Sequence, residues 1–196
     1  MATNPFDPGY FTEDDLADAG FKSLGRNVRV AKNNTMVGVE NISIGDHVRI
    51  DGYCGLIASG GRLDIGSYVH IGGWSYLSAG QGIRLDDFSG LSQGVRIYSR
   101  TDDYSGKHLT NPTVPAKYTG GVGGEVVLGR HVILGSGTVV LPRVTVGEGA
   151  SVGALSLVTK NLEAWGVYFG CPVRRLKSRS KKLLELEADL HREGAG

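Results

Sequence analysis

The chain has 196 residues, 31 of them glycine, and a formal net charge of +1. This length supports one sizeable core, and the near-neutral charge gives no overall basic field for nucleic acid or an anionic membrane surface. The start, MATNPFDPGYFTEDD, does not resemble a signal peptide, and no run is apolar enough for membrane insertion. Two cysteines, Cys54 and Cys171, make no disulfide framework, so a cytoplasmic protein is the default interpretation.

The first element in chain order is a short helix within TEDDLADAGF, residues 12–21. Thr12 suits the N-cap, acidic residues fill the first turn, and Gly20 stands near the end. We therefore assign residues 1–27 to an N-terminal helical cap.

The next part of the chain repeats every six residues. A helix would space core residues three and four apart and a strand two apart, so a period of six indicates short strands separated by corners. Such a period is typical of a parallel β-helix. The clearest aliphatic positions are Leu128, Leu134, Val140, Val146, Val152 and Val158. Four residues after each lies a second inward position, occupied by Val132, Thr138, Val144, Ala150, Ser156 and Leu162.

The same period extends backward with interruptions. Glycine-rich insertions at 59–61 and 80–82 fall where corners would bulge, and Val30 and Met36 begin a poorer first coil. If three hexads make one triangular coil, residues 28–162 form an all-β solenoid. The earlier aliphatic positions are Ile44, Ile50, Leu56, Ile65, Ile71, Leu77, Leu85, Leu91 and Ile97.

Residues 98–127 interrupt the repeat. They have no period and are rich in Gly, Pro, Asp and Thr, yet the coils resume in register after them. A long irregular segment inside a domain is usually functional, so we expect a protruding loop.

The last segment, 163–196, is predicted to be a turn followed by a C-terminal helix. In RRLKSRSKKLLELEADLHRE, Leu176, Leu183, Leu186 and Leu190 recur at helical spacing. We expect these leucines to cap the last coil or to contact a neighbouring chain.

The segment LGSGTVVLPRVTVGEGASVGALSLVTKNL…WGVYFGCPVRRLK resembles the left-handed β-helix, hexapeptide-repeat acyltransferases. The loop sequence IYSRTDDYSG…TNPTVP is similar to bacterial enzymes that acetylate sugars for surface polysaccharides, among them the acyltransferases of nucleotide-linked 4-amino-4,6-dideoxyglucose. Galactoside and maltose O-acetyltransferases are more distant relatives. The resemblance implies the left hand of the coil, a homotrimer, and acetyl-CoA as co-substrate in a groove between subunits, without a metal.

The activity implied is acetyl transfer to a nucleotide-linked deoxyamino sugar for O-antigen or exopolysaccharide synthesis. An amine or hydroxyl attacks the thioester, a general base takes the proton, and a backbone N–H stabilises the oxyanion. The alternative is an O-acetyltransferase of a glycoside or polysaccharide unit. Two weaker alternatives are a γ-carbonic-anhydrase-like zinc enzyme, for which the histidine spacing is wrong, and a non-catalytic solenoid.

The catalytic base is expected to be His70. Galactoside-type enzymes carry a catalytic histidine at the start of the loop, where this chain has Asp102, and a carboxylate is a weak base near neutral pH. The resemblance places His70 at a position that contacts substrate, and we expect Asp102 or Asp103 to orient its ring. His131 is the second candidate, and either histidine is otherwise an ordinary exposed or paired side chain.

Binding residues complete the expected site. Asp103 and Tyr104 suit a polyhydroxy sugar or an amine, although adjacent aspartates also form ordinary turns. The remaining residues expected at the substrate are Asn111 and His131. Coenzyme A is expected to meet backbone N–H groups and small residues, and then basic residues at its phosphates. These positions are Gly135, Ser136, Ala154, Thr159, Lys160, Arg174, Arg175 and Lys177.

Overall fold

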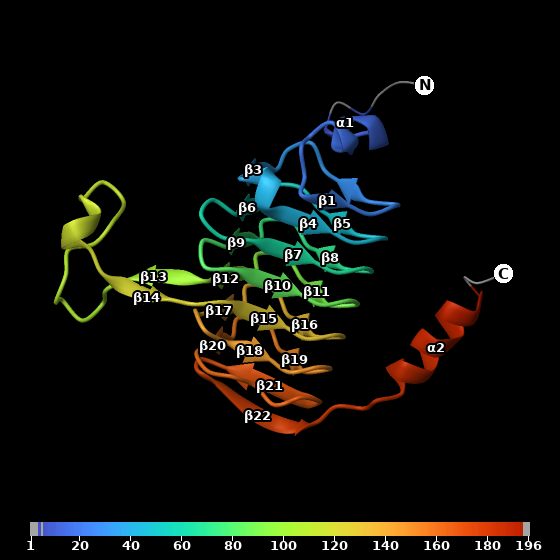
Figure 1. Ribbon diagram of the computed structural model, residues 1–196. Coiled ribbons are helices and arrows are strands. Elements are labelled where there is room, and N and C mark those ends of the chain that lie inside the picture. Colours follow the sequence, from blue (N-terminus) through green and yellow to red (C-terminus); the bar gives the residue numbers. More distant parts are fainter. Residues whose placement is uncertain (1–3, 5, 194–196) are drawn as a thin grey trace.

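The hexad repeat winds the chain into a stack of triangular coils (Figure 1). This computed structural model describes residue 4 and residues 6–193; the outer ends of the first and last predicted segments, residues 1–3, 5 and 194–196, lie outside the described part. Each coil contributes one short strand to each of three faces, and strands of successive coils pair in parallel. The predicted all-β solenoid is therefore confirmed.

The three faces are named in the order in which a coil passes through them. The first face contains β1 (Ser23–Leu24), β4 (Ile42–Ile44), β7 (Leu63–Ile65), β10 (Ile83–Leu85), β15 (Val126–Leu128) and β18 (Thr145–Val146). The second face contains β2 (Arg29–Val30), β5 (Arg49–Ile50), β8 (His70–Ile71), β11 (Gly90–Leu91), β16 (Ile133–Leu134), β19 (Ser151–Val152), β21 (Gly166–Gly170) and β22 (Val173–Ser178). The third face contains β3 (Thr35–Val37), β6 (Gly55–Ile57), β9 (Tyr76–Ser78), β12 (Arg96–Tyr98), β17 (Val139–Val140) and β20 (Leu157–Val158).

The interior of the stack is filled by the two inward positions of each hexad. All twelve residues named for 128–162 are buried, as are the nine aliphatic residues of the earlier coils. Small and β-branched side chains fit here because each coil is narrow and turns sharply at its corners. Removing these side chains from water supplies the main favourable term for folding.

The protruding segment is an antiparallel ribbon. Strand β13 (Arg100–Asp102) pairs with β14 (Gly121–Gly123), and a short 3₁₀ helix η2 (Ala116–Tyr118) lies near the tip. Figure 1 shows the ribbon extending away from the stack at the edge where the third face turns into the first. The stack continues across it in register, because Leu85 pairs with Leu128 and Leu91 with Leu134.

The two ends differ from each other. Helix α1 (Glu13–Ala17) starts with the expected cap: Asp15 N–H donates to Thr12 Oγ1, and Thr12 N–H donates to the Asp15 carboxylate. A second short 3₁₀ helix, η1 (Val39–Asn41), follows β3. Helix α2 (Leu183–Glu193) is shorter than the pattern predicted.

The prediction of helix around Leu176 is wrong. This residue lies in β22, which pairs antiparallel with β21, and its side chain is exposed. The strand covers the last edge of the second face, whose backbone groups would otherwise be open to pairing with another chain. The three later leucines line a hollow between α2 and the second face, beside Phe88 and Ile133.

Candidate active site

His70 lies on the second face, where the repeat points its ring outward. It is half exposed, and its Nε2 is 2.8 Å from Oδ2 of Asp51. The neighbouring position on the next coil is Gly90, where an added Cβ would meet nothing within 4 Å. The surface beside the His70 ring is therefore open.

The partner of His70 differs from the expected one. We predicted that Asp102 or Asp103 would orient the ring, whereas in this chain Asp51 does so, one coil away. Asp51 also accepts a hydrogen bond of 2.7 Å from Arg49 Nε. Burial opposes ionisation of Asp51, but hydrogen bonds from His70 and Arg49 outweigh it and hold the pKa of Asp51 below its ordinary value.

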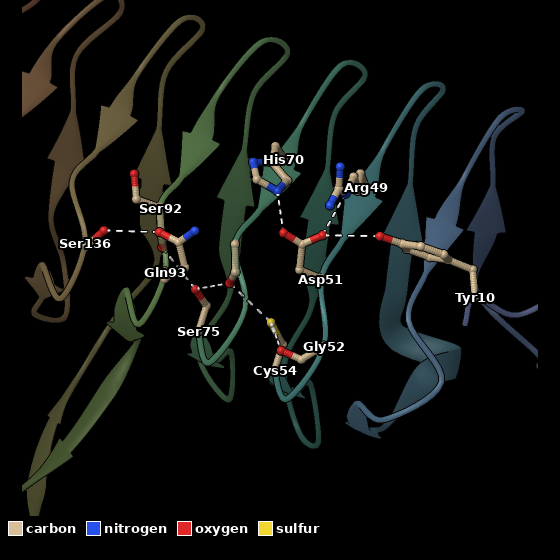
Figure 2. Close-up of polar contacts among 11 residues, drawn as sticks. Tyr10, Arg49, Asp51, Gly52, Cys54, His70, Ser75, Ser92, Gln93 and Ser136 are labelled. Carbon is tan, nitrogen blue, oxygen red and sulfur yellow. Dashed lines mark hydrogen bonds and ion pairs between the residues drawn. The ribbon is translucent and has the colours of Figure 1, made fainter. Parts of the chain in front are cut away.

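More polar groups follow along the corner between the second and third faces (Figure 2). Ser136 Oγ donates to Gln93 Oε1 at 3.3 Å, and Ser75 Oγ donates to the Gly72 carbonyl at 2.6 Å. Ser92 is half-buried and stands directly after the inward Leu91. These groups and the Asp51–His70 pair lie on successive coils of one edge, as Figure 2 shows.

Asp102 lies on the ribbon, over the third face. It lines a hollow of about 670 Å³ together with Tyr76, Tyr98, Tyr104 and Arg100. This hollow has aromatic walls, a carboxylate and a guanidinium, which suits a polar ligand that carries a ring. Neither His70 nor Ser92 lines it.

Asp103 is engaged inside the ribbon. Its side chain accepts from Ser105 N–H at 2.7 Å and lies 2.9 Å from His108 Nδ1. Hydrogen bonds from Ser105 and then from His108 hold the pKa of Asp103 far below its ordinary value. Asp103 therefore shapes the loop and fixes His108, whereas Tyr104 beside it is almost fully exposed.

Asn111 and His131 both make contacts within the chain. Asn111 Oδ1 accepts from Thr113, which is turn chemistry, and its N–H lies 3.4 Å from an Asp102 oxygen. His131 is 7% exposed, stacks on Phe88 at 5.2 Å and lies 2.8 Å from Glu187. The structure thus places His131 under α2 at the corner between the first and second faces, away from His70.

The residues expected at coenzyme A fall into three groups. Gly135, Ser136 and Ala154 lie together on the same edge as Ser92. A Cβ on Gly135 would stand 2.5 Å from the backbone nitrogen of Ala154, so only glycine fits between these coils. Thr159 and Lys160 follow β20 and are exposed, and the basic residues Arg174, Arg175 and Lys177 lie on β22.

Sequence reasoning missed Asp51, Ser92 and Gln93. Asp51 and Ser92 each stand one residue after an inward aliphatic residue, at the position where other coils carry glycine, such as Gly72 and Gly135. The sequence signal for Asp51 and Ser92 is therefore a polar residue at a hexad position that is glycine on other coils.

In the part of the chain that the structure describes, no group of three or more His, Cys, Asp or Glu side chains is arranged to hold a metal ion. Neither described helix is long and apolar enough to cross a membrane.

Comparison with known proteins identifies relatives along most of the chain. No family model matches. The chain is 44% identical over 179 residues to the dTDP-4-amino-4,6-dideoxy-D-glucose acyltransferase of Escherichia coli, covering 91% of this chain and 93% of the relative.

Solved structures give the same result. AntD, an N-acyltransferase from Bacillus cereus solved with dTDP and 3-hydroxybutyryl-CoA, is 38% identical with a TM-score of 0.92, covering 96% of this chain and 99% of that one. A maltose O-acetyltransferase from Clostridium difficile, 24% identical with a TM-score of 0.56 over 86% and 75% of the two chains, shares the fold. The chain is an acyltransferase and belongs to the left-handed β-helix, hexapeptide-repeat family, in the branch that contains the dTDP-4-amino-4,6-dideoxyglucose acyltransferases.

Proposed function

We propose that this enzyme transfers an acyl group, acetyl in the first instance, from acyl-CoA to the amino group of a nucleotide-linked 4-amino-4,6-dideoxy sugar. The observation that carries the proposal is the likeness to two such enzymes over more than nine-tenths of each chain. AntD has been solved with dTDP-4-amino-4,6-dideoxyglucose and coenzyme A together. O-acetylation of a plain glycoside has weaker support, since that relative shares the fold at low identity.

Asp102 is proposed to bind the amine and take its proton. Solved AntD variants include substitutions at one serine and at one aspartate, ten positions apart. Ser92 and Asp102 are the serine–aspartate pair with that spacing in this sequence. A carboxylate accepts strong hydrogen bonds from an amine, and a hydroxyl or backbone N–H at Ser92 suits the developing oxyanion.

The transfer balances without a metal or redox partner. The neutral amine nitrogen forms a bond to the thioester carbon, and the bond from that carbon to sulfur breaks. The proton lost from nitrogen passes to the base, and the coenzyme A thiolate leaves. His70, held by Asp51 beside the open surface at Gly90, is the second proposed base.

The site is proposed to form between copies of the chain in a homotrimer. The edge that carries Ser92 is at one side of the third face, and the ribbon that carries Asp102 leaves from the other side. Two copies laid side by side would bring the ribbon of one to the edge of the other. A cytoplasmic location is proposed with it, since both co-substrates are metabolites and both cysteines are free thiols.

Coenzyme A is proposed to run along this edge toward the last coils. Gly135, Ser136 and Ala154 would flank its pantetheine arm. The exposed Thr159 and Lys160, and the basic residues of β22, Arg174, Arg175 and Lys177, would meet its phosphates.

The test is release of coenzyme A with acetyl-CoA as donor. The acceptors are dTDP-4-amino-4,6-dideoxyglucose, its counterpart with a hydroxyl at the fourth carbon, and maltose. We expect release with the amino sugar alone. Transfer only to a hydroxyl would favour the O-acetyltransferase, and no release above hydrolysis with any acceptor would contradict the proposal.

Substitutions then separate the proposed bases. Asp102→Asn is expected to lower kcat about a hundredfold or more, while the affinity for coenzyme A stays unchanged. His70→Ala is compared with His131→Ala as the matched change at a structural histidine. A normal rate for Asp102→Asn together with a lost rate for His70→Ala would transfer the role of base to His70.

A further inference from the structure

The corner between the second and third faces contains a break in a stack of side chains. One residue per coil adopts the left-handed backbone conformation here, at positions 53, 74, 94, 137 and 155. Tyr53 and Trp74 stack with ring centroids 4.4 Å apart. The next two positions are Gly94 and Gly137, so the stack stops although the backbone turn continues.

One level of this stack is empty. The Leu155 side chain leans into the space of Gly137, where an added Cβ would lie 2.8 Å from Leu155 Cδ2. At Gly94 an added Cβ would meet only a backbone nitrogen at 3.9 Å. Because adjacent coils are about 4.8 Å apart, one flat ring fits between Trp74 and Leu155 at the level of Gly94.

Two large aromatic side chains are exposed at this corner. Trp74 is 64% exposed and Tyr53 is 58% exposed, and they stand side by side. Both border a hollow of about 370 Å³ that Gln93 also lines. A large exposed aromatic beside a hollow is typical of a site that stacks a planar ligand.

The groups around the empty level suit a nucleotide. Arg96 Nη1 donates to the Gly94 carbonyl at 3.3 Å, so the Arg96 guanidinium lies beside the empty level. Guanidinium groups bind phosphate oxygens in a two-pronged geometry. Gln93 Oε1 accepts from Ser136, so its NH₂ group is presented as a donor, and pyrimidine carbonyls are acceptors.

We propose that the thymine ring of the nucleotide sugar stacks on Trp74 in the space above Gly94, with Arg96 at the diphosphate. This inference rests on the proposed function and adds the part of the site that recognises the nucleotide. The other nucleobase among the proposed co-substrates is the adenine of coenzyme A. The basic residues proposed to bind the phosphates of coenzyme A, however, lie on β22, at the far end of the stack.

Calorimetric titration of the full chain with dTDP, inorganic pyrophosphate and coenzyme A tests this. Gly94→Trp fills the empty level with a ring on the same backbone conformation that Trp74 already adopts. We expect it to weaken dTDP binding at least tenfold, and to leave pyrophosphate and coenzyme A within twofold of the parent. Gly60→Trp is the matched control, because Gly60 is also left-handed and open but lies at another corner. It should change none of the three affinities.

A second variant guards against misfolding. Trp74→Leu removes the ring on which the thymine would stack. We expect about a tenfold loss of dTDP affinity, because base stacking is worth that much, and no loss of pyrophosphate affinity. If Gly94→Trp also weakens coenzyme A binding, the dTDP affinity of Trp74→Leu is the deciding result.

Unchanged dTDP affinity in both variants overturns the thymine site. The proposed function still stands in that case if the parent chain releases coenzyme A with the amino sugar. A loss confined to coenzyme A would assign the space to adenine and overturn the proposal. An altered molar mass of Gly94→Trp with unchanged dTDP affinity would assign it to a second copy. Absence of both dTDP binding and turnover in the parent chain would overturn the proposed function together with this inference.

Discussion

Two corners of the same coil stack have the same backbone and different side chains. At the corner between the first and second faces, His47, Tyr68, Phe88 and His131 occupy the left-handed position of four successive coils, with neighbouring ring centroids 4.7–5.2 Å apart. The next coil has Gly149 at this position, and the Trp165 ring of the coil after it leans into that space, 6.4 Å from His131. Together these side chains form the continuous stack. At the corner between the second and third faces the stack stops after Trp74. One residue per coil therefore distinguishes an edge covered by stacked side chains from an edge with an empty level.

The continuous stack also holds the C-terminal helix. Glu187 of α2 pairs with Arg130 and with His131, and His191 lies edge-on to Tyr68 and Phe88. The interrupted edge carries the polar groups drawn in Figure 2 instead. The first corner therefore contributes to stability and the second to the proposed chemistry, and each can be tested on its own.

The largest expected effect on stability comes from breaking the continuous stack. Phe88→Ala removes a half-buried ring that packs between Tyr68 and His131. We expect a loss of about 2–3 kcal/mol in the free energy of unfolding, measured by urea denaturation. Tyr53→Ala at the interrupted corner is the matched change and should cost about 1 kcal/mol. Equal losses would remove the distinction between the two corners.

The next effect concerns coil spacing at the interrupted corner. Gly135→Ala places a Cβ 2.5 Å from backbone of the next coil and is expected to cost about 2 kcal/mol. Gly90→Ala, whose Cβ would meet nothing within 4 Å, should leave the melting temperature unchanged. A normal melting temperature for Gly135→Ala would show that the coils can move apart there.

A smaller effect is expected where α2 meets the continuous stack. Glu187→Gln weakens the contacts to Arg130 and His131 and should cost about 1 kcal/mol. Amide exchange within α2 should become faster while that of β11 and β16 does not change. Glu185→Gln, an exposed position on the same helix, serves as the control and should leave exchange in α2 unaltered.

The smallest effect is a pH dependence at Asp51. Its pKa is lowered in the folded chain, so its stabilising contribution is complete above the unfolded value of about 3.9 and is lost as pH falls through the folded value. The difference in unfolding free energy between the parent and Asp51→Asn should therefore be fully present at pH 5 and shrink below about pH 4. A difference that grows on acidification would refute this sign.

The architecture was predictable from the sequence because the period is local. Every inward aliphatic residue from Ile44 to Val158 is buried where the hexads place it, since each hexad encodes its own strand and corner. The strand at Leu176 was not predictable by the same reasoning. Its partner β21 follows a turn outside the repeat, so helical leucine spacing was the stronger local signal.

The site was less accessible to sequence reasoning. His70 is outward and open as predicted, and Gly135, Ser136 and Ala154 share an edge. The Asp51 partner depends on which residues of adjacent coils align, and the period fixes that alignment only after the insertions at 59–61 and 80–82 are counted correctly. His131 contacts Glu187, 56 positions away, which no local pattern reveals, and its expected role at the substrate stays a prediction.

We propose that one copy supplies the corner at Gly94 and another supplies the ribbon at Asp102. Mixing the Gly94→Trp and Asp102→Asn proteins in equal amounts, after unfolding and joint refolding, tests it directly. With limiting nucleotide sugar, random trimers should recover about a quarter of the parent rate, because that share of contacts pairs an intact corner with an intact ribbon. A mixture no more active than either variant alone would contradict a site shared between copies.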